Sequence, residues 1–125
     1  YAKKLQVGAI IVSQNRDRVI SIGYNGTPPG YDNVCEYVLE DSGELITKPE
    51  VIHAEQNAIF KLARDGEAGL GSTIYCTYLP CMPCAKAILM SGIKKVVYAN
   101  TYRDISSIKF LTDCGVEVNQ YEMNI

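Results

Sequence analysis

One imidazole and two thiols give this chain the residue types that bind zinc. His53 is its only histidine, and Cys81 and Cys84 form a C-x-x-C pair. Two thiols at positions i and i+3 project from the same side of a helical turn, so the three side chains could hold one metal ion. A structural zinc site is normally closed by four protein ligands, whereas a catalytic site has three and leaves the fourth position to water. Three ligands therefore favour a catalytic site.

Other readings of these residues remain open at this point. The three remaining cysteines could in principle supply a fourth ligand, although nothing in their spacing favours any of them: Cys35, Cys76 and Cys114. Such isolated cysteines are more commonly small buried hydrophobic residues. A lone C-x-x-C is also typical of a redox pair or of half a structural zinc clip. The choice depends on what accompanies the ligands.

An acidic residue, Glu55, follows the histidine by two positions. In a regular helix such a pair points about 200° apart, so both residues can flank one site only at a helix N-terminus. The pattern predicts a helix over 52–64, with Gly66 as its stop and apolar residues at helical spacing: Ala54, Ala58, Ile59 and Leu62. A second helix begins at the cysteines. Helix starts favour thiolate and hydroxide, so the arrangement suits a hydroxide-generating site.

The remaining pattern predicts the frame that carries this site. Two apolar, β-branched runs at 7–13 and 19–24 flank a polar turn and indicate an antiparallel hairpin. Further strands are expected at 72–77, 95–99 and 116–120, and further helices at 81–92 and 106–113. Because helices separate the later strands, those strands should be parallel. The fold class is α/β, a mixed five-stranded sheet covered by helices. Residues 34–49 are ambiguous, and a short helix ending at Gly43 is one interpretation.

Bulk properties indicate a single domain over 1–125 with a small-molecule substrate. The chain has 125 residues, 47% of them hydrophobic, and a formal net charge of -2. This balance provides no broad basic surface for nucleic acid, although basic pairs could gather locally and hold a phosphate. No apolar stretch is long enough to span a membrane, and the first residues do not resemble a signal peptide, so we expect a cytoplasmic protein.

Two motifs together place the chain in a family. H-A-E at 53–55 and P-C-M-P-C at 80–84 match the H-x-E…P-C-x-x-C signature of zinc nucleobase deaminases. The chain resembles the cytidine and deoxycytidylate deaminase superfamily over essentially its whole length. The resemblance implies a three-layer cytidine-deaminase-like fold and one catalytic Zn²⁺ on His53, Cys81 and Cys84. It also implies that Glu55, itself no ligand, shuttles protons while water attacks the cytosine ring and ammonia leaves.

The segment GYNGTPPG at 23–30 resembles the loop of the deoxycytidylate (dCMP) deaminases. That resemblance implies dCMP as substrate and dUMP, a precursor for thymidylate synthesis, as product. It also implies substrate contacts from Asn25, Ala54 and Tyr102, and a possible effector loop made of Gly23, Tyr24, Gly26 and Thr27. Many members are hexamers that respond to dCTP with Mg²⁺ and to dTTP. The resemblance therefore implies a homo-oligomer, a hexamer, with dCTP and dTTP as possible effectors.

Two alternatives come from other classes. The chain could deaminate another cytosine substrate, either cytidine or a nucleic-acid base, or it could be a non-catalytic zinc-binding module. A polymer substrate calls for an electropositive groove, against which the net charge argues, although nine tyrosines keep base stacking open. Retention of Glu55 argues against a purely structural module, because such a site has no use for a proton shuttle.

Overall fold

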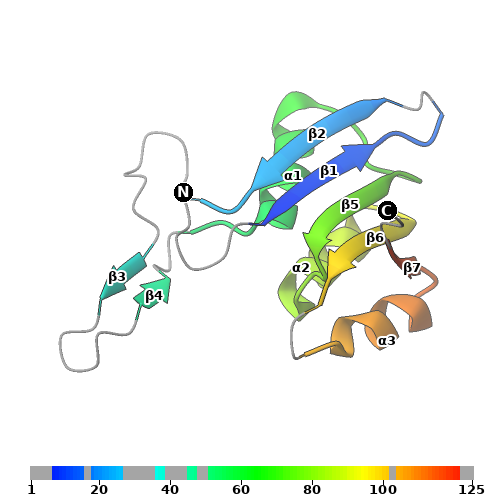
Figure 1. Cartoon of the computed structure of the whole chain (residues 1–125). Helices are drawn as coiled ribbons and strands as arrows, with labels where there is room; N and C mark the ends of the chain where they lie inside the picture. The colour runs from blue at the N-terminus through cyan, green and yellow to red at the C-terminus, as the bar shows by residue number, and fades with distance from the viewer. Residues whose placement is uncertain are drawn as a thin grey trace, which may run out of the picture.

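A twisted sheet backed by helices dominates the computed structural model of the chain (Figure 1). The structure describes residues 7–15, 18–26, 51–101 and 104–121, and the backbone of two short strands at 36–38 and 45–47. Five strands form the main sheet in the order β2-β1-β5-β6-β7. Their bounds are β1 Gly8–Val12, β2 Val19–Tyr24, β5 Thr73–Tyr78, β6 Lys95–Asn100 and β7 Glu117–Gln120.

The strand directions are mixed, as the sequence predicts. β1 runs antiparallel to both β2 and β5, and β5, β6 and β7 are mutually parallel. A hairpin needs only a tight turn, whereas each parallel step needs a crossover, which the helices supply. The predicted hairpin and the predicted parallel strands are therefore both confirmed.

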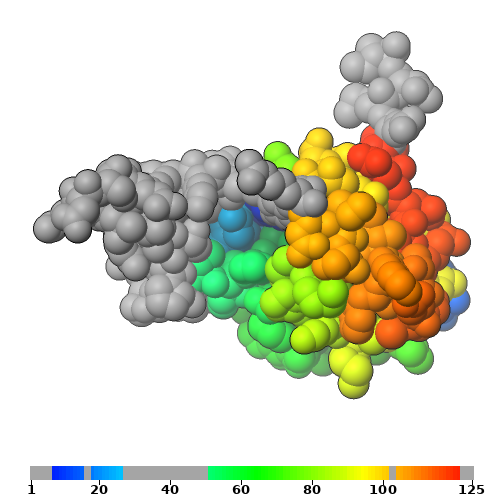
Figure 2. Space-filling view, turned by 90° about the horizontal axis from the view of Figure 1, so that it is seen from below, coloured from blue at the N-terminus to red at the C-terminus, as the bar shows by residue number. Residues whose placement is uncertain are grey.

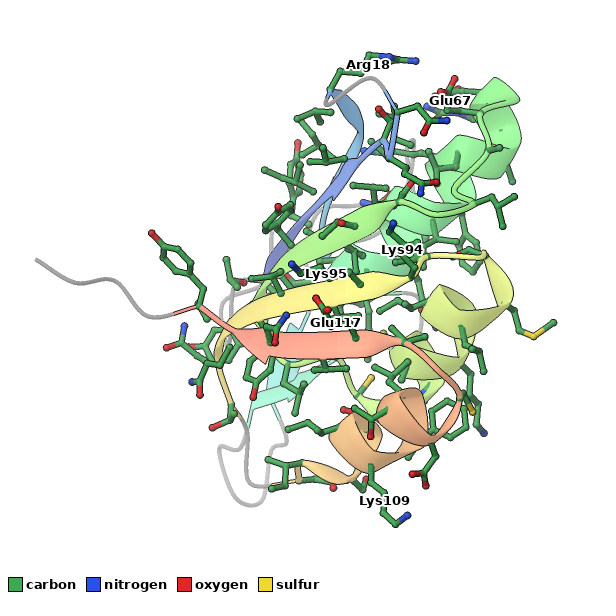
Figure 3. All side chains as sticks on the ribbon, turned by 90° about the vertical axis from the view of Figure 1, so that its right-hand side faces the viewer. Arg18, Glu67, Lys94, Lys95, Lys109 and Glu117 are labelled. Atoms are coloured by element: carbon green, nitrogen blue, oxygen red, sulfur yellow. The ribbon has the colours of Figure 1, made fainter. Side chains whose placement is uncertain are left out.

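Three helices pack against one face of this sheet. They are α1 Ala54–Asp65, α2 Met82–Met90 and α3 Ser106–Asp113. The crossovers through α2 and α3 step along the sheet in the same direction, and right-handed connections then place both helices on the same side (Figures 1 and 3). α1 ends at Gly66, whose φ of 71° is the left-handed conformation that glycine adopts without strain.

The hydrophobic core lies between the helices and the inner face of the sheet. Alternate strand residues point inward and are buried, in keeping with the two-residue period of a strand: Ala9, Ile11, Ile74, Cys76, Val96 and Tyr98. The outer face carries exposed apolar residues, Ile10, Ile22, Tyr24 and Tyr75 among them, around a hollow of about 440 Å³. Within the described ranges helices cover one face only, which accounts for two of the three expected layers.

A second, two-stranded sheet corrects one interpretation of the sequence. β3 Glu36–Val38 and β4 Leu45–Thr47 pair antiparallel, with Glu36 opposite Thr47. The short helix considered for residues up to Gly43 is therefore wrong at 36–38. Both three-residue segments contain β-branched or aromatic residues, and their pairing satisfies backbone groups that a helix would have bonded internally.

Surface ion pairs join neighbouring elements (Figure 3). Arg18, in the hairpin turn, lies 3.0 Å from Glu67, which follows α1, and Lys95 of β6 lies 3.2 Å from Glu117 of β7. These side chains are substantially exposed, so each pair contributes little to stability. Among the helices of the described ranges, none has the length and apolar character required to cross a membrane.

Candidate functional site

The imidazole and the two thiols singled out by the sequence converge on one point. Nδ1 of His53 lies 3.2 Å from Sγ of Cys84 and 3.4 Å from Sγ of Cys81. The three ligand atoms all lie within 4.8 Å of one another. Tetrahedral zinc, with bonds of about 2.0–2.1 Å to nitrogen and about 2.3 Å to sulfur, places adjacent ligand atoms roughly 3.5 Å apart. The donor set and its spacing therefore fit zinc.

Two helix starts bring these ligands together. His53 is the N-cap of α1, and Cys81 is the N-cap of α2, with Cys84 buried in the first turn that follows. The ring of His53 makes no capping hydrogen bond to its own helix, so it is available to face the two thiols. α1 and α2 contact each other, and Figure 2 shows the green start of α1 beside the yellow-green α2. The predicted placement of both motifs at helix N-termini is confirmed.

Hydrogen bonding within the cluster favours an ionised thiol. The pKa of Cys81 falls to about 4, mainly because the Cys84 thiol hydrogen-bonds to its sulfur, with His53 contributing a second hydrogen bond. The same contact raises the pKa of Cys84, which keeps its proton while Cys81 carries the charge. The hydrogen bond to Cys81 also raises the pKa of His53. Because thiolate is the form that binds metal, the site is electrostatically prepared for a cation.

Glu55 lies beside this cluster without being part of it. Its side chain is only 4% exposed, and burial, the largest effect, raises the pKa of its carboxyl group. A hydrogen-bond contact with the Cys84 side chain lowers that pKa in part. A buried carboxyl group with a raised pKa can exchange a proton near neutral pH, which a general acid and base requires. The buried carboxyl group therefore lies beside three side chains that could hold a metal ion.

The loop after β2 lies against the segment that leads into His53. Gly26 and Ile52 exchange two backbone hydrogen bonds, of 3.1 and 2.8 Å, and form an isolated β-bridge. Asn25 is anchored as well, because its Oδ1 accepts a hydrogen bond of 2.9 Å from the backbone N–H of Val7. Gly26, in the described part of the sequence-predicted loop, therefore lies beside the segment that leads into His53, although the two are about thirty residues apart in the chain.

Gly23 has a packing role that the sequence analysis did not foresee, and Ala54 is buried, as its place in the apolar pattern of the helix predicts. A Cβ atom on Gly23 would lie 2.4 Å from the carbonyl oxygen of Ala54 and 2.6 Å from the nitrogen of Ala58. β2 thus needs glycine where α1 crosses it, and the methyl group of Ala54 is fully buried in the core. The predicted ligand contacts of Tyr102 and Thr27 fall on residues outside the described ranges.

Two other residues lie near the site: Cys76, which the sequence analysis expected to be a small buried hydrophobic residue, and Asn57, which it did not single out. Cys76 is buried in β5, where burial chiefly, and also the charge of Glu55, raises the pKa of its thiol. Asn57 of α1 donates a hydrogen bond from Nδ2 to the carbonyl oxygen of Tyr24. The alternation of buried and exposed residues along β5 could have placed Cys76 on the inner face. No local sequence pattern predicts the hydrogen bond between Asn57 and Tyr24. Within the described part, neither Cys76 nor Cys114 joins the ligand group.

Comparisons with known proteins agree with this geometry. The family model of the cytidine and deoxycytidylate deaminase zinc-binding region matches residues 1–100. A deoxycytidylate deaminase of Enterobacteria phage T4 is 38% identical over 78% of the chain and 68% of its own length. One from Saccharomyces cerevisiae is 37% identical over 94% of the chain. The chain spans only 38% of that yeast protein.

Solved structures show the same relationship in three dimensions. The dCMP deaminase of cyanophage S-TIM5, solved in complex with dCMP and dUMP, superposes with a TM-score of 0.84 at 45% identity. That match covers 95% of this chain and 83% of the other. A deaminase-reductase from Thermotoga maritima, at 28% identity and a TM-score of 0.66, shares the fold more distantly. The predicted cytidine-deaminase-like class is confirmed, and the chain belongs to the cytidine and deoxycytidylate deaminase family.

Proposed function

We propose that the chain catalyses the zinc-dependent hydrolytic deamination of dCMP to dUMP with release of ammonia. The observation that carries this proposal is the three-ligand cluster of His53, Cys81 and Cys84 with the buried carboxyl group of Glu55 against it. The likeness to the S-TIM5 enzyme, whose structure holds dCMP and dUMP, supports the choice of nucleotide. The same reaction would supply dUMP for thymidylate synthesis.

In this proposal three side chains bind the metal ion and a fourth, Glu55, transfers protons. His53, Cys81 and Cys84 would hold Zn²⁺, which when bound supplies the Lewis acidity that makes water nucleophilic near neutral pH. Glu55 accepts a proton from the water and delivers it to N3 of the cytosine ring, which makes C4 electrophilic. The hydroxide adds to C4, and Glu55 takes the proton of the new hydroxyl group and passes it to the amino group; the C4–N bond then breaks, ammonia leaves and the C4 carbonyl group forms. Burial raises the pKa of Glu55, which favours proton uptake by its carboxyl group and supports this role.

Substrate contacts are assigned to Asn25, Ala54 and Tyr102. The bridge between Gly26 and Ile52 supports a role for Asn25, since it places the loop next to the metal ligand His53. The side-chain oxygen of Asn25 is held by Val7, which orients its amide group for recognition. An oriented amide is the kind of group that discriminates a sugar or a base by hydrogen bonding.

Regulation and assembly follow from the family resemblance. We propose a hexamer in the cytoplasm that binds dCTP with Mg²⁺, or dTTP, as effectors. The effector loop would comprise Gly23, Tyr24, Gly26 and Thr27. The close approach of α1 by itself accounts for the glycine at position 23.

The test is ultraviolet-detected deamination of dCMP, deoxycytidine, CMP and dCTP by the zinc-loaded protein, with and without dCTP plus Mg²⁺. We expect turnover of dCMP alone, and none by Glu55→Ala, which should bind zinc as the unchanged protein does. Turnover of none of these nucleotides would overturn the proposal, and full activity in Glu55→Ala would overturn the role of that residue.

A further inference from the structure

The outer edge of the sheet carries two hydrogen bonds from α1. β2 is an edge strand, so some of its backbone groups face away from β1. The backbone N–H of Asn25 donates to the Val7 carbonyl, which makes these two residues a hydrogen-bonded pair. Pairs alternate along an antiparallel ladder, so the carbonyl groups of Ile22 and Tyr24 point outward.

Both outward carbonyl groups are bonded by side chains of α1. Lys61 Nζ donates to the Ile22 oxygen at 2.9 Å, and Asn57 Nδ2 donates to the Tyr24 oxygen at 3.0 Å. The two contacts join the same helix to the same strand but differ in place. The Lys61 contact lies within β2, whereas the Asn57 contact lies where β2 ends and the loop begins.

The contact of Asn57 completes a closed ring that contains a metal ligand. The backbone N–H of Asn57 donates to the His53 carbonyl at 2.8 Å, and its side chain reaches Tyr24. Two residues on, Gly26 pairs with Ile52, which precedes His53 in the chain. The loop therefore cannot move relative to His53 without breaking one of these hydrogen bonds.

We propose that Asn57 is a positioning residue, which holds the loop after β2 in register with the metal-binding end of α1. The inference rests on the proposed function, in which this loop contacts the nucleotide through Asn25. Asn57 is not among the three side chains that could hold the metal ion. It fixes the distance between the loop that carries Asn25 and the start of α1, where His53 lies.

The expected signature is a separation of KM from kcat. Loss of one neutral hydrogen bond, together with the greater freedom of the segment it held, corresponds to roughly a tenfold change in the affinity for substrate. Asn57→Ala should raise KM for dCMP about tenfold, lower kcat less, and leave zinc content unchanged. Asn57→Gln retains the donor and should recover part of the loss. Asn57→Asp has nearly the same size but no side-chain donor, and it replaces the alanine variant if Asn57→Ala folds poorly.

Lys61→Met is the matched control. It removes the other hydrogen bond from α1 to the edge of β2, and both KM and kcat should stay within about twofold of the unchanged protein. A KM that is unchanged in Asn57→Ala, or raised equally in Lys61→Met, would overturn the proposal.

Hydrogen exchange of the Gly26 and Ile52 amides provides a readout that requires no substrate. Exchange of both amides should accelerate in Asn57→Ala and not in Lys61→Met, because only the former opens the ring. Unchanged protection in Asn57→Ala would overturn the positioning role. Absence of dCMP turnover by the unchanged protein would instead refute the proposed function. Failure of the positioning role and failure of the proposed function are therefore distinguishable.

Discussion

Gly23→Ala should disturb the catalytic centre from a position that contains no catalytic group. The added Cβ would lie 2.4 Å from the Ala54 carbonyl oxygen, where ordinary contact begins at 3.4 Å, so α1 must retreat by about 1 Å. The neighbouring atoms are backbone and cannot rotate away. Overpacking of this kind costs about 1–3 kcal/mol of stability. Displacing the helix that carries His53 and Glu55 by about 1 Å should lower turnover by about a hundredfold.

The assay combines urea unfolding, bound zinc and turnover of dCMP. Gly8→Ala is the control, because Gly8 lies opposite Tyr24 in the partner strand and a Cβ there meets only Thr77, at 3.9 Å. Both substitutions reduce the conformational entropy of the unfolded chain alike, so their difference isolates the clash. Equal unfolding free energies and equal turnover in the two variants would refute the close-approach argument.

Three further outcomes follow from the site and the core. Cys84→Ser should lose zinc to a chelator more readily than Cys114→Ser does, because only Cys84 is in the ligand group; equal metal contents after dialysis would contradict this assignment. In metal-free protein the pKa of Cys81 of about 4 means that its thiolate should absorb near neutral pH and protonate as pH falls through that value; an ultraviolet titration, with Cys81→Ser as blank, measures it. Ile74→Ala should lower the free energy of unfolding by about 2–5 kcal/mol, because the side chain is fully buried. Ile10 lies on the outer face of the sheet and is 39% exposed, so Ile10→Ala should lower the free energy much less in the same denaturation experiment.

The helix starts could be predicted because their signals are local. The spacing of His53 and Glu55, and of Cys81 and Cys84, restricts the backbone within one turn, and the structure places both pairs as expected. Hydrophobic periodicity likewise predicted the five strands of the main sheet, and the connections between them, a short turn or a helix, predicted their directions. Residues 36–38 were ambiguous, because a three-residue strand is too short for any period to register.

What the sequence could not reveal depends on contacts between distant segments. Gly23 is glycine because α1, more than thirty residues later, passes close to β2. Asn57 bonds to a carbonyl group thirty-three residues earlier, and an asparagine within a helix looks like any exposed polar residue. Such requirements become visible only when the register of β2 against β1 and the placement of α1 are both known.

The hydrogen bonds from α1 to the outward carbonyl groups of β2 also bear on self-association. An incoming strand pairs with an exposed sheet edge through its free backbone groups, and aggregation commonly begins there. On β2, Asn57 and Lys61 occupy two of the acceptors such a strand would need, and Lys61 adds a charge beside the edge. The helix that carries the metal ligand thus also shields the sheet. Any treatment that loosens α1, metal depletion included, should therefore promote aggregation along with loss of activity.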